Sequence, residues 1–435
     1  MKNINLEFID FLKKSPTQFN AVDSIEEILK NNNYKLLKEN ESWNIKSGKY
    51  YVIRNGSSII AFNIPTKIND YHFQLCSSHV DSPTFKIKNI SELEGPNSYL
   101  RLNVEKYGGA VLYTWFDKPL SVAGRVILKN KNKTISKNIY IDDDLFIIPS
   151  MPPHINRDIN TKFEPNVQID LCPLFSTGEL HKGDFINMLA DYLKVKADNI
   201  FSYDLYLVNR QEPKLLGYKK EFLCAAKLDD LQASYSSLIG FVESNNKCIN
   251  VFASFDNEEV GSLTKQGASS TFLYDVLTRI NNSLGKTQDD YFKAISKSFN
   301  VSFDNAHAVN PNHPEKYDQE NRCFMNKGVV IKENASQSYT TDGFSRAVFK
   351  QVCDLANIPT QSFANRSDSR GGSTLGNLSN NQVSMNTVDI GLAQLAMHSN
   401  YETSGSKDTE YAYKALKKYY SSNILIDGTN SFEIK

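Results

Sequence analysis

Two adjacent glutamates, Glu258 and Glu259, follow an apolar segment that ends at Phe255. One carboxylate of such a pair can bind a metal ion while its neighbour takes a proton from a water on that metal. The apolar segment, residues 248–255, is predicted to be a strand, and open α/β sheets bind ligands at the carboxyl ends of their strands. The pair alone is weak evidence, because adjacent acidic residues usually lie on a solvated surface.

Other strand ends carry side chains that suit the same chemistry. His79 and Asp81 follow a predicted strand over residues 73–77, so the imidazole could bind a metal while the carboxylate orients the ring. For this pair in isolation, a surface His-x-Asp is the better interpretation. Asp304 directly follows the apolar run 299–303, which predicts another carboxyl-end position.

Asp229 and Asp230 lie where a loop enters a predicted helix, where an aspartate can cap the helix or be shared between two metal ions. His398 follows the apolar run 392–397 and, by itself, is typical of a core or loop histidine. Taken singly, each residue has a structural explanation at least as good as the functional one. Together they suit two zinc-like ions, each with one imidazole and carboxylate oxygens, and Glu258 would supply the general base.

Composition narrows the class of protein. The chain has 435 residues, a length that predicts two domains with a sizeable core. It contains 49 Lys+Arg and 49 Asp+Glu, so its formal net charge is zero. Balanced charge without charge runs argues against nucleic acid and membrane surfaces as partners. The first residues are too polar for a signal peptide, and no apolar run could cross a bilayer. The 6 cysteines include no Cys-x-x-Cys pair, which is typical of reduced core residues in a cytoplasmic protein.

Two patterns near the amino terminus predict local structure. Ser15-Pro16 is expected to open an amphipathic helix, because serine caps helices and proline suits the first helical position. Asn55-Gly56 between two apolar runs predicts a hairpin. From residue 228 onward strands alternate with helices, which predicts an α/β fold with a mainly parallel sheet flanked by helices. The expected strands are 248–255, 299–303 and 385–390, and the expected helices are 269–280, 345–356 and 408–420.

The middle third of the chain has a different pattern. Apolar residues alternate in 99–104 and again in 201–207, as in half-buried strands, and residues 185–193 carry a helical stripe. These patterns predict a β-rich domain inserted into the α/β domain. The expected division is 1–88 for the first part of the catalytic domain, 89–225 for the insert and 226–435 for the second part.

Five strings, in this order along almost the whole chain, resemble the M18 family of metallo-aminopeptidases, specifically the aspartyl aminopeptidase group. The ordered set is more specific than any one motif. The strings are Ser78-His-Val-Asp-Ser-Pro83, Lys227-Leu-Asp-Asp230, Phe255-Asp-Asn-Glu-Glu-Val-Gly-Ser262, Ser302-Phe-Asp-Asn-Ala-His-Ala-Val309 and Gln394-Leu-Ala-Met-His-Ser399.

The resemblance implies a zinc-exopeptidase-like fold, a dimerisation domain as the insert, and dimers that assemble into a dodecamer. It also implies a role for each residue of the set. One metal would be held by His79 and Asp304 and the other by Glu259 and His398, with Asp229 bridging, Glu258 as general base and Asp81 orienting His79.

Five further residues would line the substrate site if the resemblance extends to them. Lys332 would pair with an acidic N-terminal side chain, although a solvated surface lysine is the common alternative. His154 would be lent to a neighbouring subunit's active site, and an ordinary loop histidine is an equal alternative. His307 falls inside a matching string. Gly372 and Ser373 would place backbone donors beside the substrate, or form a simple turn.

These observations predict an enzyme that removes the N-terminal residue of peptides, favouring Asp or Glu, with two divalent metal ions. Zinc is the expected metal, and the ligand set also suits cobalt or manganese. Three alternatives remain at this point: a broad neutral aminopeptidase, another two-metal amidohydrolase, and a catalytically silent assembly protein.

Overall fold

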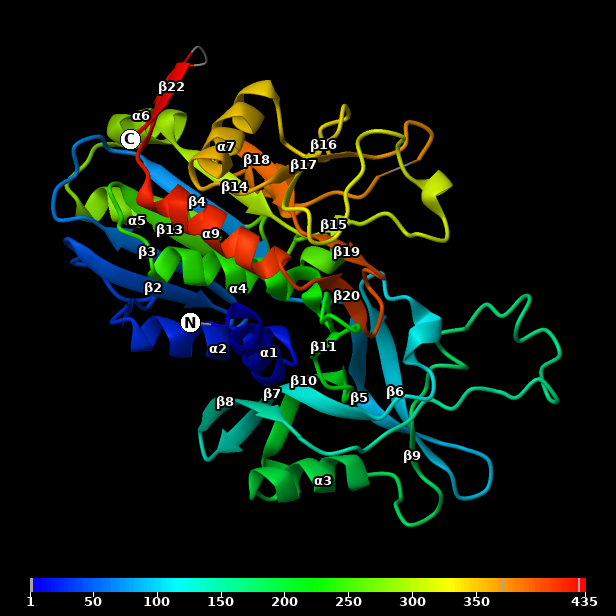
Figure 1. The fold of residues 1–435 in the computed structure, drawn as a ribbon. Coiled ribbons are helices and arrows are strands. Elements are labelled where there is room, and N and C mark those ends of the chain that lie inside the picture. Colours follow the sequence, from blue (N-terminus) through cyan, green and yellow to red (C-terminus); the bar gives the residue numbers. More distant parts are fainter. Residues whose placement is uncertain (1–2, 370, 429–430) are drawn as a thin grey trace.

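The computed structural model describes residues 3–369, 371–428 and 431–435. Its larger part is built on a mixed nine-stranded sheet (Figure 1). The central neighbours pair in parallel, whereas β2–β3, β3–β13 and β16–β18 are antiparallel. In sheet order the strands are β1 (Lys35–Leu36), β2 (Gly48–Arg54), β3 (Ser58–Ile64), β13 (Ile249–Phe255), β4 (Phe73–His79), β14 (Phe299–Phe303), β18 (Asn386–Gly391), β16 (Val329–Glu333) and β17 (Thr360–Ala364).

Helices cover both faces of this sheet, so the central strands are apolar throughout rather than alternating. In β13, Phe252 packs into the core of one face, and Val251 and Ala253 pack into the other. Figure 1 shows α4 and α9 side by side across the first face. That face carries α1 (Ile4–Lys14), α2 (Gln18–Asn31), α4 (Leu228–Val242), α7 (Gly343–Leu355) and α9 (Asp408–Ser421), and the other carries α5 (Phe272–Ser283), α6 (Gln288–Lys297) and α8 (Leu375–Ser379). The α/β prediction is therefore confirmed, with a mixed sheet.

A second, fully antiparallel sheet of six strands lies below the larger part in Figure 1. Helix α3 (Asp184–Leu193) packs against it through Phe185, Leu189 and Leu193, which is the predicted helical stripe. In sheet order its strands are β8 (Lys133–Tyr140), β7 (Leu120–Asn130), β10 (Ile200–Asn209), β5 (Thr84–Glu94), β6 (Leu100–Tyr107) and β9 (Leu174–Ser176).

The limits of this second sheet differ from the predicted 89 and 225. Residue 89 lies inside β5, which begins at Thr84, and the last strand of the sheet ends at Asn209. The hairpin of β11 (Lys214–Leu216) and β12 (Phe222–Ala225) belongs to a third sheet, because β12 pairs with the distant β20 (Glu402–Gly405). Such long-range pairing leaves no local signal in the sequence. The third sheet is completed by β19 (Ala393–Leu395) and β15 (Ala306–His307).

The local predictions near the amino terminus have mixed outcomes. The hairpin is confirmed, with Arg54 opposite Ser58. The helix begins at Gln18 with Thr17 as its N-cap, so the predicted start at Ser15-Pro16 is wrong. Ser15 is buried and its hydroxyl instead donates to Ser24 at 3.1 Å.

The carboxyl terminus ends in a short antiparallel pair, β21 (Ile424–Asp427) and β22 (Ser431–Ile434). Within the described ranges, every helix is too short or too polar to span a bilayer.

Candidate metal centre

Three predicted strand ends meet at one edge of the nine-stranded sheet. β4 lies between β13 and β14 and runs parallel to both, so their carboxyl ends share an edge. His79 is the last residue of β4 and lies opposite Phe255, the last residue of β13. Asp304 follows β14 directly, and its N–H donates to the carbonyl of Ile390 at 3.0 Å. The sheet topology thus brings together residues that are more than 200 positions apart.

The carboxylate of Asp229 lies between the two imidazoles of this edge. Its Oδ1 is 3.4 Å from His79 Nε2, and its Oδ2 is 3.5 Å from His398 Nε2. Asp304 Oδ1 approaches the first ring at 3.8 Å, and Glu259 Oε1 approaches the second at 3.3 Å. The five residues therefore form two groups that share one carboxylate.

Irregular backbone at the start of α4 aims the two aspartates in different directions. Asp229 and Asp230 have non-helical dihedral angles and are joined by a cis peptide bond. Asp230 is fully buried and its Oδ2 accepts a hydrogen bond from the N–H of His79 at 3.2 Å. Its ligand atoms lie within 4.8 Å of those of His79, Asp229 and Asp304. Only Asp229, however, contacts both imidazoles.

Asp81 fixes the turn that carries the two glutamates. Its Oδ1 accepts the N–H of Glu258 at 3.1 Å, and its Oδ2 accepts the N–H of Glu259 at 3.2 Å. Its carboxylate is 3.4 Å from His79 Nδ1, while its main-chain carbonyl is closer to the same nitrogen, at 3.0 Å. The ring of His79 is thus oriented mainly by the carbonyl of Asp81, and the carboxylate holds the glutamate turn.

The second sheet also reaches this site, which the sequence did not predict. Tyr107, at the end of β6, donates its hydroxyl hydrogen to Asp81 Oδ2 at 2.7 Å. Gly108 follows with φ +72°, and a Cβ there would lie 3.1 Å from the Cβ of Glu259. The carbonyl of Gly109 is 3.2 Å from His398 Nδ1. A glycine pair directly after a strand was the available sequence signal, since such pairs permit close backbone approach.

Burial and crowding of carboxylates disturb the titration of both glutamates. Burial, together with the charges of Asp304, Asp81 and Asp229, raises the pKa of Glu258 to about 8. Burial and the charge of Asp229 also raise the pKa of Glu259 well above its usual range. A nearby divalent cation would offset this repulsion and favour the charged carboxylates.

The imidazoles respond to the same charges in the opposite sense. Burial acts to lower the pKa of His398, but its hydrogen bond to Asp229 and the charges of Glu259 and Glu402 raise it to about 10. Burial would raise the pKa of Asp229, but the imidazoles of His398 and His79 lower it below its usual range. Asp229 therefore stays ionised more readily than either glutamate.

The cluster has the properties of a metal-binding site. Asp229 Oδ1 and Glu259 Oε1 are buried and have no hydrogen-bond partner among the described residues. Buried polar atoms are normally satisfied in proteins, so these lone pairs are available to a ligand. Imidazole and carboxylate donors suit zinc, and also cobalt or manganese. The residues present fit divalent metal ions.

Two of the predicted substrate residues lie near the cluster. Lys332 is buried, not a solvated surface lysine, and its ammonium donates to the carbonyls of Asp304 at 2.7 Å and Asn305 at 3.3 Å. Its Nζ is 3.8 Å from Asp304 Oδ2. His307, in β15, has an exposed side chain whose ring centre lies 6.3 Å from that of Phe363.

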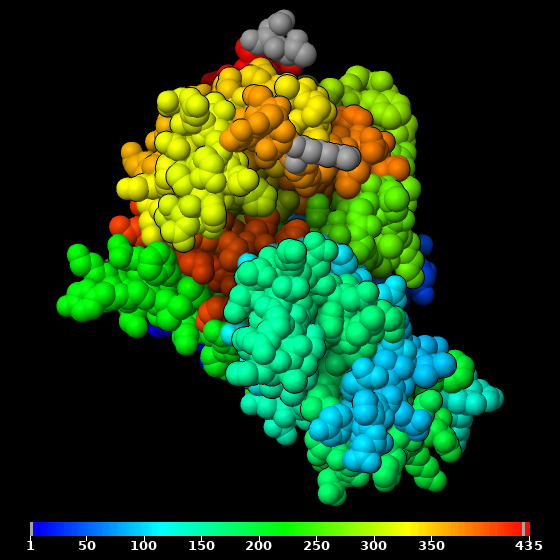
Figure 2. All heavy atoms as spheres, turned by 90° about the vertical axis from the view of Figure 1, so that its right-hand side faces the viewer, coloured from blue at the N-terminus to red at the C-terminus, as the bar shows by residue number. Residues whose placement is uncertain are grey.

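The remaining predicted substrate residues lie on exposed loops. Gly372 and Ser373 precede α8, and the hydroxyl of Ser373 contacts Asn377 Oδ1 at 3.2 Å. His154 is exposed on the segment 141–173, between β8 and β9. This segment, in teal green, projects from the molecule in Figure 1 and faces the viewer in Figure 2.

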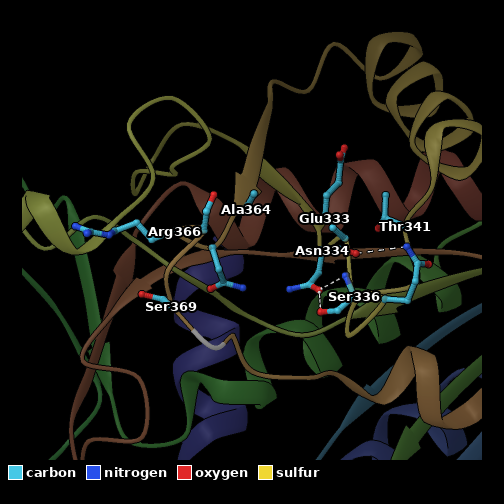
Figure 3. A pocket seen from close by; sticks show the side chains of 11 residues that line it. Glu333, Asn334, Ser336, Thr341, Ala364, Arg366 and Ser369 are labelled. Atoms are coloured by element: carbon cyan, nitrogen blue, oxygen red, sulfur yellow. Dashed lines mark hydrogen bonds between the residues drawn. The ribbon is translucent and has the colours of Figure 1, made fainter.

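A polar recess of about 610 Å³ lies between the loops that follow β16 and β17 (Figure 3). Asn334 and Ser336 form one side, where Asn334 Oδ1 accepts the N–H of Ser336 at 2.9 Å. Arg366 and Ser369 lie on the other side. Its described lining does not include the predicted metal ligands.

An α/β sheet with such a donor cluster at its strand ends has the architecture of a metallohydrolase. The family described as Aminopeptidase I zinc metalloprotease (M18) matches residues 11–420. The chain is 45% identical over 423 residues to Probable M18 family aminopeptidase 2 from Clostridium novyi (strain NT), covering 95% of this chain and 98% of that protein. It is 37% identical to Aspartyl aminopeptidase 1 from Schizosaccharomyces pombe, covering 98% of each. The chain belongs to the M18 family of zinc metallo-aminopeptidases, and it is a hydrolase of the exopeptidase class.

Solved structures agree with this assignment. One of them, "Cryo-EM structure of the Ape4 and Nbr1 complex", superposes with a TM-score of 0.93 at 36% identity, covering 96% of this chain and 85% of that one. Another, "Structure of S. cerevesiae mApe1 dodecamer", superposes with a TM-score of 0.83 at 26% identity, covering 96% of each chain.

Proposed function

We propose that this enzyme hydrolyses the N-terminal residue of peptides at a pair of divalent metal ions, with preference for Asp or Glu. The observation that carries the two-metal part is the placement of Asp229, which offers one carboxylate oxygen to each imidazole. His79 and Asp304 would hold one ion, and Glu259 and His398 the other. Zinc would occupy both positions, and cobalt or manganese could replace it.

Bound ions of this kind lower the pKa of a water molecule and polarise the scissile carbonyl. Glu258 accepts the water proton and delivers it to the leaving amine. Burial and neighbouring carboxylates raise the pKa of Glu258, and bound cations would lower it again, so that the ionised carboxylate could accept the proton. Asp81 keeps Glu258 in place through the main-chain hydrogen bond to its N–H.

Preference for an acidic first residue would rest on Lys332. An ammonium group has three hydrogens to donate, and two of them are directed at the carbonyls of Asp304 and Asn305. One hydrogen remains for a substrate carboxylate. The relative named Aspartyl aminopeptidase 1 supports this choice of substrate.

A broad neutral aminopeptidase is the second candidate, and the same lysine favours it. Because Lys332 already donates to the carbonyl of Asp304 and lies 3.8 Å from its carboxylate, its charge could serve this proposed metal ligand rather than the substrate. Other two-metal amidohydrolases and a silent assembly protein lack an observation of this kind.

We further propose that residues 89–225 act as an inserted dimerisation domain and that dimers assemble into a dodecamer. Two observations support this: a structural relative is a dodecamer, and His154 is exposed on a projecting segment. In that assembly His154 would enter the active site of a neighbouring subunit, beside His307, Gly372 and Ser373. Mass photometry of the purified protein would measure the assembly size directly.

The test of the activity is release of the first residue from matched Asp-, Glu-, Leu- and Lys-peptides. Chelated protein is compared with protein reloaded with zinc, cobalt or manganese. Metal-dependent cleavage that favours Asp and Glu is expected. Metal-dependent cleavage that favours Leu would keep the mechanism and replace the acidic preference, and absence of cleavage with every metal would overturn the proposal.

A further inference from the structure

A buried carboxylate that carries no assigned role, Glu402, contacts both halves of the candidate metal centre. It lies in β20 and is 1% exposed. Its Oε2 accepts the N–H of Asp229 at 3.0 Å, and its Oε1 accepts the N–H of His398 at 2.7 Å. The side chain of Glu402 therefore links the main chain of Asp229 to the main chain of His398.

The two N–H groups need such a partner because neither belongs to regular structure. Asp229 has φ −82° and ψ 106° before the regular turns of α4, and His398 has φ +67° in the loop after β19. Buried N–H groups are costly to leave without an acceptor. Hydrogen bonds to a carboxylate are also about twice as strong as those between neutral groups.

The oxygens of Glu402 are directed at main-chain N–H groups and not at the metal positions. In the described part of the chain, the clusters whose ligand atoms lie within 4.8 Å of one another do not include Glu402. Gln394 Nε2 is a further donor to Oε1, at 3.4 Å. Each oxygen thus has a hydrogen-bond donor from the protein.

We propose that Glu402 is a positioning residue that fixes the spacing between the two halves of the metal centre and so allows two ions to be held together. The inference rests on the proposed two-metal function. The main chain of Glu402 is paired with Ala225 in the third sheet, so a change of its side chain leaves that pairing in place. Loss of one carboxylate oxygen would free either Asp229 or His398.

The test is zinc binding by chelator-treated protein, followed by calorimetric titration and by elemental analysis after gel filtration. The wild type is expected to bind two ions per chain. Glu402→Gln places an amide N–H₂ against a main-chain N–H, so its second ion should bind about 10–100-fold more weakly, as for other partners of metal ligands. Glu402→Asp keeps the charge with a shorter reach and should show an intermediate loss.

Asp408→Asn is the matched control. Asp408 is also a fully buried carboxylate that accepts a main-chain N–H, from Asn326 at 2.7 Å, but it lies outside the metal clusters. The Asp408→Asn variant should keep wild-type zinc affinity. Unchanged zinc affinity in Glu402→Gln would overturn the inference, and Glu402→Asp replaces this variant if the amide variant does not fold. An equal loss of zinc affinity in Asp408→Asn would also overturn it. A single ion in the wild type would overturn the two-metal proposal as well.

Discussion

The metal centre and the segment that carries His154 differ in how the fold holds them. The proposed metal ligands lie at strand ends, at the start of α4 or in short loops, and hydrogen bonds link them to other elements, as Glu402 links Asp229 to His398. The segment 141–173 consists of turns and isolated bridges, and His154 is exposed. A single chain therefore brings the proposed metal ligands together by itself, whereas the proposed role of His154 involves a neighbouring subunit.

Removal of the metal ions from the candidate metal centre should have the largest effect on activity. Chelation should abolish peptide hydrolysis, because the proposed mechanism has no other group to polarise the carbonyl. Activity should return on adding zinc, and the secondary structure measured by circular dichroism should stay unchanged, since the sheet holds the ligands. Full activity in protein shown by elemental analysis to be metal-free would contradict this prediction.

Loss of the general base should have the next largest effect. Glu258→Gln keeps the size of the side chain and should lower kcat by about 10²–10⁴-fold, with two zinc ions still bound. The exposed Glu320, which lies outside the cluster, provides the control Glu320→Gln with wild-type kcat. A near wild-type rate in Glu258→Gln would remove this residue from the mechanism.

Substitution of Lys332 distinguishes a substrate-binding role of this lysine from a structural one. If it binds an acidic side chain, Lys332→Met should lower kcat/KM for Asp-peptides about 10–100-fold more than for Leu-peptides, because hydrogen bonds to charged groups contribute about 1.5–3 kcal/mol. The exposed Lys316 gives the control Lys316→Met, with the wild-type ratio. Equal losses on both peptides would show that Lys332 instead supports Asp304.

The smallest effect is expected at His154. His154→Ala should lower kcat/KM about 2–10-fold, as for loss of one neutral hydrogen bond, with metal content and assembly size unchanged. His181 is another exposed histidine, and His181→Ala should keep wild-type kinetics. Unchanged kinetics in His154→Ala would show that the projecting segment contributes nothing to the active site, and would sharpen the contrast between the two regions.

The predicted strands correspond well to the observed ones where both faces of a strand are buried. Residues 299–303 coincide with β14, and the predicted 385–390 differs from β18 by one residue at each end. Burial on both faces requires a continuous apolar run, which is visible in the sequence itself. Strand β5 was missed, because its burial varies along its length and its polar residues obscure the pattern.

The sequence by itself determined the residue types of the proposed metal ligands, their order along the chain and, for most of them, their positions after apolar runs, because these follow from local pattern and motif. Only the tertiary structure decided which carboxylate lies between the imidazoles, that Lys332 is buried, and that Tyr107 and Glu402 support the site. These facts depend on pairing between distant strands. β20 reaches Asp229 only because it pairs with β12, about 180 residues earlier in the chain.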